Sequence, residues 1–253
     1  MNFRIILEAM KFYKIRRERV IQIWFILLYA INLLVFVLPI GDRDFSRLFD
    51  AFTTLTSGDL NVQPAWELLT PGNWLLIGLS FLVSLITLFF SYLYAVYFIG
   101  EQDDMTPGQA VVRCLRKIPA MLAVCVVLLL PALMSACFAF IPLIIFLFMM
   151  YFLPLDLALE NRPLLESIRY SYEMTRHKKL IILVEVALLS LAVTIPQNII
   201  LNLISGYDIL YYALASFFVV IRAFMQGRMM GILYLFLVKK VPDVIPSKPN
   251  EQM

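Results

Sequence analysis

Charged residues are scarce in this chain. Lysine, arginine, aspartate and glutamate make up 15% of its 253 residues, whereas hydrophobic residues make up 62%. Soluble domains typically carry about 25% charged and about 45–50% apolar residues. The composition therefore excludes an ordinary soluble domain and predicts a single integral membrane domain over residues 1–253.

Residues that carry metal and redox chemistry are also few. The chain has one histidine, His177, and its three cysteines, Cys114, Cys125 and Cys137, form no C-x-x-C spacing. This set disfavours both a closed zinc site and a structural disulfide. Cysteines in apolar surroundings usually serve as small fillers. We expect no metal and no cofactor.

Catalytic motifs are missing as well. The sequence contains no H-E-x-x-H, no G-x-S-x-G and no P-loop. Tyr207-Asp208 resembles half of an intramembrane aspartyl protease site, but Asp156, the obvious second carboxylate, is expected at the opposite membrane face. No aromatic-interleaved basic surface stands clear of the bilayer to bind nucleic acid. We therefore expect a non-enzymatic protein that does not bind nucleic acid.

Long apolar runs are what the chain has in abundance. Lipid cannot hydrogen-bond a backbone, so an apolar run of about 20 residues is interpreted as a membrane-spanning helix. The sequence predicts an all-α, polytopic membrane protein with six transmembrane helices at 20–40, 74–100, 118–138, 139–159, 180–201 and 209–238. The third and fourth form one run that is too long for a single crossing at about 1.5 Å per residue. We expect a tight hairpin near Ala139 and Pro142.

Lysine and arginine alternate between rich and poor connections. The N-terminal tail, the segments 101–117 and 160–179 and the C-terminal tail are basic, whereas the external loop 41–73 is mostly acidic and the two short connections lack basic residues. Cytoplasmic segments keep the positive charge, so both termini are predicted to be cytoplasmic. The same charges predict binding to anionic lipid head groups of the bilayer at that face.

A short amphipathic segment precedes each predicted hairpin of two spans, as for helices lying in the membrane interface. The second segment begins with a predicted capping box, Thr106 to Gln109, with Pro107 in the first helical position. Either the chain is a threefold duplication, or basic segments beside a membrane simply look amphipathic. In the external loop, Phe45, Leu48, Phe49 and Phe52 predict one more helix, which serves as a loop anchor or a partner contact. The apolar faces of the three amphipathic segments are Phe3, Ile6, Leu7, Met10 and Tyr13; Ala110, Val111, Cys114, Leu115 and Ile118; and Leu164, Leu165, Ile168 and Tyr172.

Polar side chains within predicted spans are candidate sites, because they are rare there and face the protein interior or water. Arg228 and Glu185 are expected to form an ion pair, and Arg222 lies at the depth of Gln197. These groups either fix the helix register or line a polar pathway. The candidate cluster is Glu185, Gln197, Asn198, Arg222, Gln226 and Arg228, and a stripe of small residues for helix packing is Ala223, Gly227 and Gly231.

The segments 154–160 (PLDLALE) and 164–171 (LLESIRYS) carry a family resemblance. The chain resembles poorly characterised bacterial six-span membrane proteins, similar to the membrane domain attached to some glycerophosphodiester phosphodiesterases. This resemblance implies the bacterial cytoplasmic (inner) membrane and no established activity. We expect an accessory, scaffold or envelope-homeostasis component with a possible membrane protein partner. The alternative is a small transporter or channel subunit whose path is lined by spans five and six.

Overall fold

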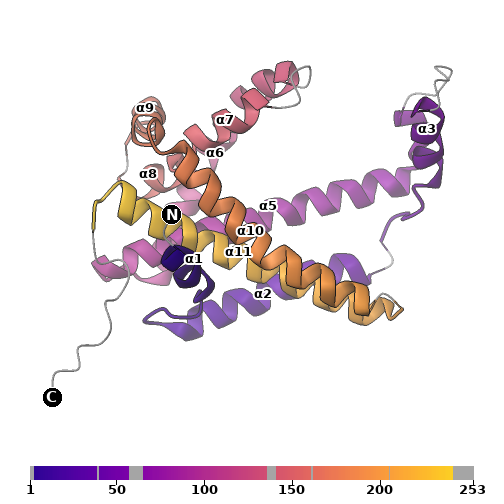
Figure 1. Ribbon diagram of the computed structural model, residues 1–253, viewed down its shortest axis with the longest axis horizontal. Coiled ribbons are helices and arrows are strands. Elements are labelled where there is room, and N and C mark those ends of the chain that lie inside the picture. Colours follow the sequence, from indigo (N-terminus) through magenta and orange to yellow (C-terminus); the bar gives the residue numbers. More distant parts are fainter. Residues whose placement is uncertain are drawn as a thin grey trace.

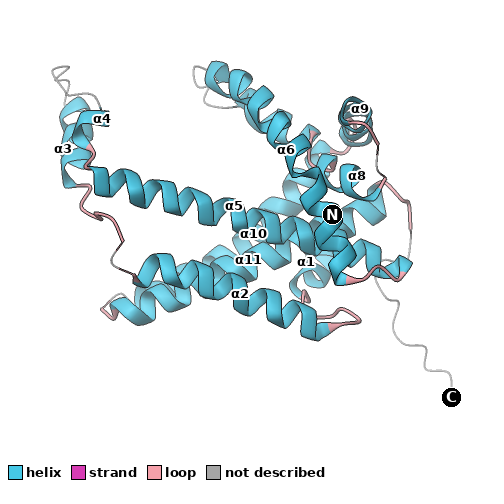
Figure 2. Ribbon diagram, turned by 180° about the vertical axis from the view of Figure 1, so that it is seen from behind, coloured by secondary structure: helices cyan, strands magenta, loops and turns pink. Residues whose placement is uncertain are grey.

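In a computed structural model of the chain, residues 3–38, 40–56, 65–135, 141–160, 162–204 and 206–241 are described, and every regular element among them is helical (Figures 1 and 2). The all-α prediction is confirmed for this part of the chain. The helices are α1 (Phe3–Met10), α2 (Glu18–Val37), α3 (Ser46–Thr56), α4 (Ala65–Leu68), α5 (Pro71–Gly100), η1 (Glu101–Asp103), α6 (Pro107–Ser135), α7 (Ile141–Met149), α8 (Leu153–Leu159), α9 (Leu164–Thr175), α10 (Lys179–Leu203) and α11 (Asp208–Leu237).

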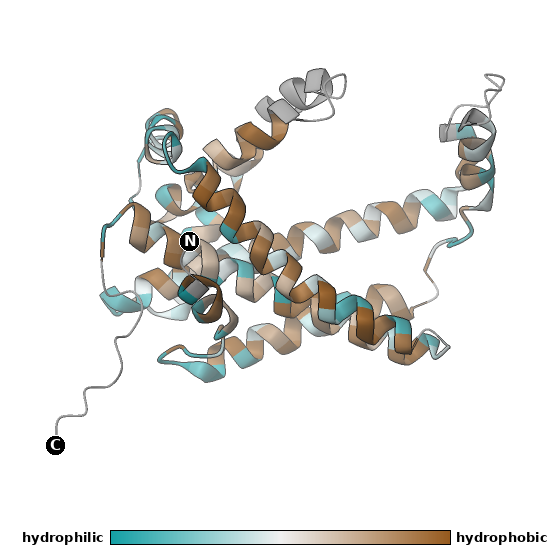
Figure 3. Cartoon of the chain, in the orientation of Figure 1, coloured by the Kyte–Doolittle hydropathy of each residue, from teal (hydrophilic) through white to brown (hydrophobic). Residues whose placement is uncertain are grey.

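Four of these helices, α2, α5, α10 and α11, are long and apolar enough to cross a membrane. They coincide with the predicted spans 20–40, 74–100, 180–201 and 209–238, each within a few residues. In Figure 3 the hydrophobic colour follows the long helices, while hydrophilic colour gathers on α9 and on connecting segments. The chain therefore has the helices of a polytopic membrane protein.

The other two predicted spans differ in their boundaries. The second amphipathic segment is continuous with the third span in α6, a single helix of 29 residues, so it is not a separate interfacial helix. The segment 139–159 is not one helix, because a turn at 150–152 separates α7 from α8. Pro154 lies in the first turn of α8, where its missing N–H costs nothing but where it disfavours a continuous helix through the turn. The expected hairpin turn near Ala139 lies outside the described residues.

The packed core lies at one end of the molecule, around the C-terminal half of α5. From Phe90 to Gly100 nearly every side chain of α5 is buried, whereas Trp74 and Phe81 in its first half are exposed. α11 lies against α5 and also contacts α1, α2 and α10 (Figure 1). This end also holds the N-terminal helix, α8 and α9 (Figure 2). The basic segments of the sequence are therefore attached to the packed end.

Matching caps begin α5 and α6. The Thr106 side chain accepts from the Gln109 N–H, and Gln109 accepts from the Thr106 N–H, which confirms the predicted capping box. Thr70 and Asn73 make the same reciprocal pair at the start of α5. The Asn73 amide also donates to the carbonyls of Asp42 and Asp44, over 2.8 and 3.0 Å. This second cap fixes the beginning of the loop 41–73 to the start of α5.

The helix predicted from residues 45–52 is confirmed by α3 (Ser46–Thr56). Its Phe49 and Phe52 side chains are exposed. The loop begins at Gly41, just after α2, and the φ of +80° at this residue favours glycine. A Cβ at Gly41 would also lie only 2.6 Å from the Gly72 carbonyl oxygen. The loop is therefore seated closely on the start of α5.

α1 and α9 each leave part of their predicted apolar face exposed. α1 buries Ile5, Ile6 and Ala9, while Leu7 remains 52% exposed. α9 buries a stripe of hydroxyl residues, Ser167, Ser171 and Thr175, and leaves Leu165 81% exposed. Small side chains allow this close packing, and the hydroxyls of Ser171 and Thr175 donate to the carbonyl of Met149 at the end of α7. Both helices thus present apolar side chains at the molecular surface.

Candidate functional site

α11 is seated on α5 through the predicted stripe of small residues. Ala223 is buried, and a Cβ added at Gly227 would overlap the Ser91 carbonyl oxygen of α5. At Gly231, a Cβ would lie 2.6 Å from the Phe98 ring. Small residues spaced four apart share one helix face and let two backbones approach closely. The stripe therefore sets the distance at which the neighbouring Arg228 meets its partners.

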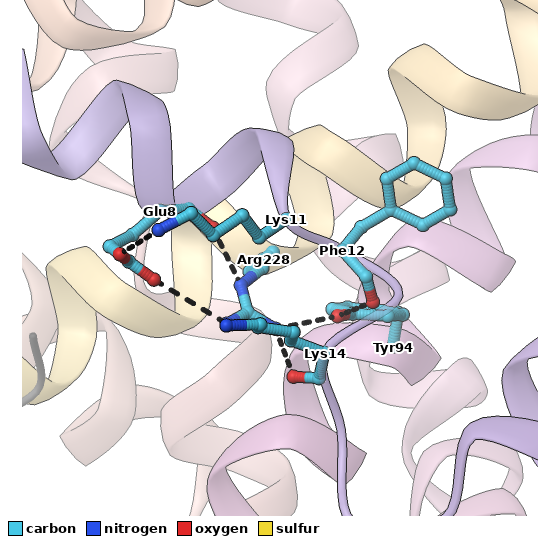
Figure 4. A network of polar contacts seen from close by, with 6 residues as sticks. All are labelled: Glu8, Lys11, Phe12, Lys14, Tyr94 and Arg228. Carbon is cyan, nitrogen blue, oxygen red and sulfur yellow. Dashed lines mark hydrogen bonds and ion pairs between the residues drawn. The ribbon is translucent and has the colours of Figure 1, made fainter. Parts of the chain in front are cut away.

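Arg228 is 6% exposed, and its guanidinium binds the chain around the end of α1 (Figure 4). Its Nε donates to the Glu8 carbonyl oxygen over 2.7 Å, and its Nη1 donates to the Lys14 carbonyl oxygen over 2.6 Å. The last carbonyls of a helix have no partner within that helix. The Glu8 carbonyl belongs to the last turn of α1 and also accepts from the Lys11 N–H over 3.2 Å, whereas the Lys14 carbonyl lies in the segment after the helix. A buried cation at this position opposes the negative end of the helix dipole. Arg228 thereby acts as a C-terminal cap supplied from another helix.

Side chains around Arg228 complete the network. Glu8 lies 3.9 Å from Nη2 and also forms an ion pair with Lys11 over 2.6 Å. The Tyr94 hydroxyl donates to the Phe12 carbonyl oxygen over 2.5 Å and lies 3.4 Å from Nη1 (Figure 4). The guanidinium carbon is also 4.9 Å from the centre of the Phe98 ring. The network thus joins α1, α5 and α11 at one point in the core.

Arg222 belongs to a second, separate contact. Its Nη2 donates to the Gln197 side-chain oxygen over 2.7 Å and to the Thr194 hydroxyl over 3.0 Å, both on α10. Charge-assisted hydrogen bonds of this kind are short and stronger than neutral ones. Arg222 therefore ties α11 to α10, whereas Arg228 ties α11 to α1.

The candidate cluster is brought together only in part. Arg222 and Gln197 are in contact, as their common depth suggested. The expected Arg228–Glu185 ion pair is wrong, because Arg228 has Glu8 as its carboxylate partner. Glu185 is buried within α10, at 2% exposure, while Asn198 is exposed and Gln226 is half-buried.

Sequence reasoning did not identify Glu8, Tyr94 or Thr194 as partners of the two arginines. The apolar face predicted for residues 3–13 does not include Glu8. In the structure, Glu8 lies three residues after Ile5 and directly before Ala9, both buried. At helical spacing these three residues share one face. A carboxylate on that face requires a buried cation.

Comparison with protein-family models, with curated proteins and with solved structures finds no match to this chain.

Proposed function

We propose that this chain is a non-enzymatic accessory or scaffold component of the bacterial cytoplasmic membrane. The observation that carries the proposal is the use made of the two arginines in α11. Arg228 binds α1 and Arg222 binds α10, so both guanidinium groups join α11 to another helix. Removing Arg228 would take a donor from the buried Glu8 and from the Lys14 carbonyl, and removing Arg222 would take one from the half-buried Thr194 and Gln197. This arrangement is typical of side chains that fix helix register.

Six crossings, with both termini in the cytoplasm, form part of the same proposal. At about 1.5 Å per residue, the 29 residues of α6 extend about 43 Å, enough to cross a bilayer. α7 and α8 would together return the chain to the starting side. The exposed apolar side chains of α1 and α9 lie at the end that carries the basic segments, which supports helices resting in the cytoplasmic interface.

The alternative of a small transporter or channel subunit needs its polar side chains to share one path. Arg222 and Arg228 instead direct their donors toward different helices, α10 and α1. The geometry therefore favours the structural role. The resemblance to bacterial six-span membrane proteins agrees with either role and remains a prediction.

Affinity purification tests the proposal. The tagged full chain is crosslinked in its native membrane, extracted in mild detergent and analysed for protein and phospholipid. We expect a reproducible membrane protein partner or an enriched anionic lipid. A similarly tagged, unrelated six-span protein serves as the control. Repeated preparations that recover nothing above that control would contradict the proposal.

A double variant of the external helix, Phe49→Ser/Phe52→Ser, locates the partner contact. Both rings are exposed in α3, so their replacement removes apolar surface without opening the core. Loss of a protein partner from this variant would place its binding surface at the external loop. Retention would place it elsewhere.

A further inference from the structure

The first observation concerns a basic cavity between α6 and α8. Arg113, Arg116 and Lys117 line a space of about 220 Å³ whose other wall is Ala158 and Leu159 at the end of α8. Arg113 and Arg116 also line a neighbouring space of about 350 Å³ beside Gly108, Gln109 and Val112. Three cationic side chains thus gather over a pocket whose floor is apolar.

The two arginines of this cavity differ from Lys117, which interacts with another group of the chain. Within the described residues, neither Arg113 nor Arg116 makes a hydrogen bond or an ion pair with another side chain. Asp103 and Glu160 are the acids nearby, and they line a further cavity together with Arg113. Glu160 is already paired with Lys239 over 2.5 Å. The two guanidinium groups are therefore available to an anion from outside the chain.

The position of the cavity selects the kind of anion. The three cations occupy the first turns of α6, directly before its apolar run. On the same helix the apolar side chains of Val112, Leu115 and Leu122 are exposed, so the cavity lies beside a surface suited to acyl chains. Basic pockets at the cytoplasmic ends of membrane helices are suited to phospholipid head groups. Guanidinium groups bind phosphate oxygens with two parallel hydrogen bonds, which makes arginine well suited to this ligand.

We propose that the cavity between α6 and α8 is a specific binding site for the phosphate of an anionic phospholipid, held by Arg113, Arg116 and Lys117. The inference rests on the proposed membrane function, in which the basic face of the chain binds anionic lipid. It assigns that binding to one site. Arg113 and Arg116 bind the phosphate oxygens, and Lys117 adds positive charge. The apolar wall at Ala158 and Leu159 faces the glycerol end of the lipid. The acyl chains follow the exposed apolar side of α6 into the bilayer.

The test measures binding of phosphatidylglycerol to the detergent-purified full chain by native mass spectrometry and by the shift of its melting temperature. Arg113→Gln/Arg116→Gln removes two charges from the cavity. Arg169→Gln/Arg176→Gln removes two exposed charges from the region of α9 and is the matched control. The cavity variant loses two charge-assisted contacts with the phosphate and should bind phosphatidylglycerol about 30-fold more weakly, while the control stays within about threefold of the original chain.

A third variant changes the cavity without changing its charge. Leu159→Trp fills the apolar wall and should also weaken phosphatidylglycerol binding. Each variant is first melted without lipid, where the two arginine variants should match the original chain because their side chains are exposed. If the cavity variant unfolds early, the comparison rests on Leu159→Trp against the α9 control.

The remaining outcomes separate the proposals. Equal weakening in the cavity and control variants would overturn the site while leaving a diffuse basic surface intact. An equal melting shift from phosphatidylcholine would overturn both the site and the proposed preference for anionic lipid. Inorganic phosphate could also raise the melting temperature as much as phosphatidylglycerol does, and only when Arg113 and Arg116 are present. That result would overturn the lipid assignment. Phosphatidylglycerol binding that only the cavity variants lose, with no effect of inorganic phosphate, would establish the site.

Discussion

Arg228 and Glu8 are 220 residues apart in the chain, yet the Nε of Arg228 donates to the Glu8 carbonyl oxygen over 2.7 Å. This bond closes the N-terminal helix onto the last long helix. It also explains why α1, a helix of eight residues that is too short to be stable alone, has a fixed place in the core. The contact between these two residues is the basis of the first prediction.

Replacing Arg228 with alanine should release α1 from the bundle. The carbonyls of Glu8 and Lys14 would each lose a buried donor, and the Glu8 carboxylate would lose its second cation. We expect the free energy of unfolding to fall by about 3 kcal/mol. Thermal melting in detergent measures the loss, and hydrogen exchange over residues 3–10 shows where it occurs. Arg169→Ala, which alters an exposed pair on α9, is the control. Unchanged protection of α1 in Arg228→Ala would contradict the capping role.

Gly227 should not tolerate a larger side chain. A Cβ there overlaps the Ser91 carbonyl oxygen, which belongs to the α5 backbone and cannot swing aside. Gly227→Ala should lower the melting temperature, and Gly227→Leu should lower it further because it forces α5 and α11 apart. Gly78→Ala is the matched control, since nothing lies within 4 Å of a Cβ at that position in α5. This control should melt at or slightly above the original temperature, as alanine favours a helix over glycine. Equal melting of all three variants would refute the close approach.

Some elements of this structure can be predicted from the sequence alone, and others cannot. The apolar runs locate α2, α5, α10 and α11 closely, because hydrophobic length is a property of the sequence alone. The cap at Thr106 is likewise local, and the same Thr-Pro-Gly pattern at residues 70–72, followed by Asn73, could have identified the cap of α5. Local signals of this kind need no knowledge of the fold.

The partners of Arg228 could not be obtained in the same way. They depend on which helix lies beside α11, and helical periodicity gives only the face of a residue and its depth. A common depth correctly matched Arg222 with Gln197. The reach of a long arginine side chain wrongly suggested Glu185, which lies at a different depth, as the partner of Arg228. α9 illustrates a similar limit, since its apolar side is the obvious packing face in a soluble protein. Here the stripe of Ser167, Ser171 and Thr175 packs instead, and the apolar side remains exposed.

Cys114 should react slowly with maleimides in the folded protein. Its side chain is buried against the core, and burial raises the pKa of the thiol to about 12. The thiolate is the reactive form, and it is therefore nearly absent at pH 8. Labelling of a variant that keeps only Cys114 should be slow in mild detergent and fast in denaturant. Labelling at the rate of a free cysteine in the folded protein would contradict the burial of this helix face.

Proteoliposomes distinguish the structural role of the arginines from a transport pathway. We expect no flux of ions or small solutes above that of empty liposomes, because Arg222 and Arg228 are bound to groups within the chain. Flux through the original protein that Arg228→Ala and Glu185→Ala abolish, with expression and melting intact, would support the transporter alternative. Arg169→Ala would serve as the charge-matched control in that assay.

The central claim is that the chain crosses a bilayer an even number of times and keeps its basic end in the cytoplasm. Its most direct test is the labelling of single cysteines, introduced into a cysteine-free background at both termini and in the external loop 41–73, with a membrane-impermeant reagent in oriented vesicles. We predict that both termini are labelled only from the cytoplasmic side and the loop only from the opposite side. Labelling of the two termini from opposite sides would contradict the claim.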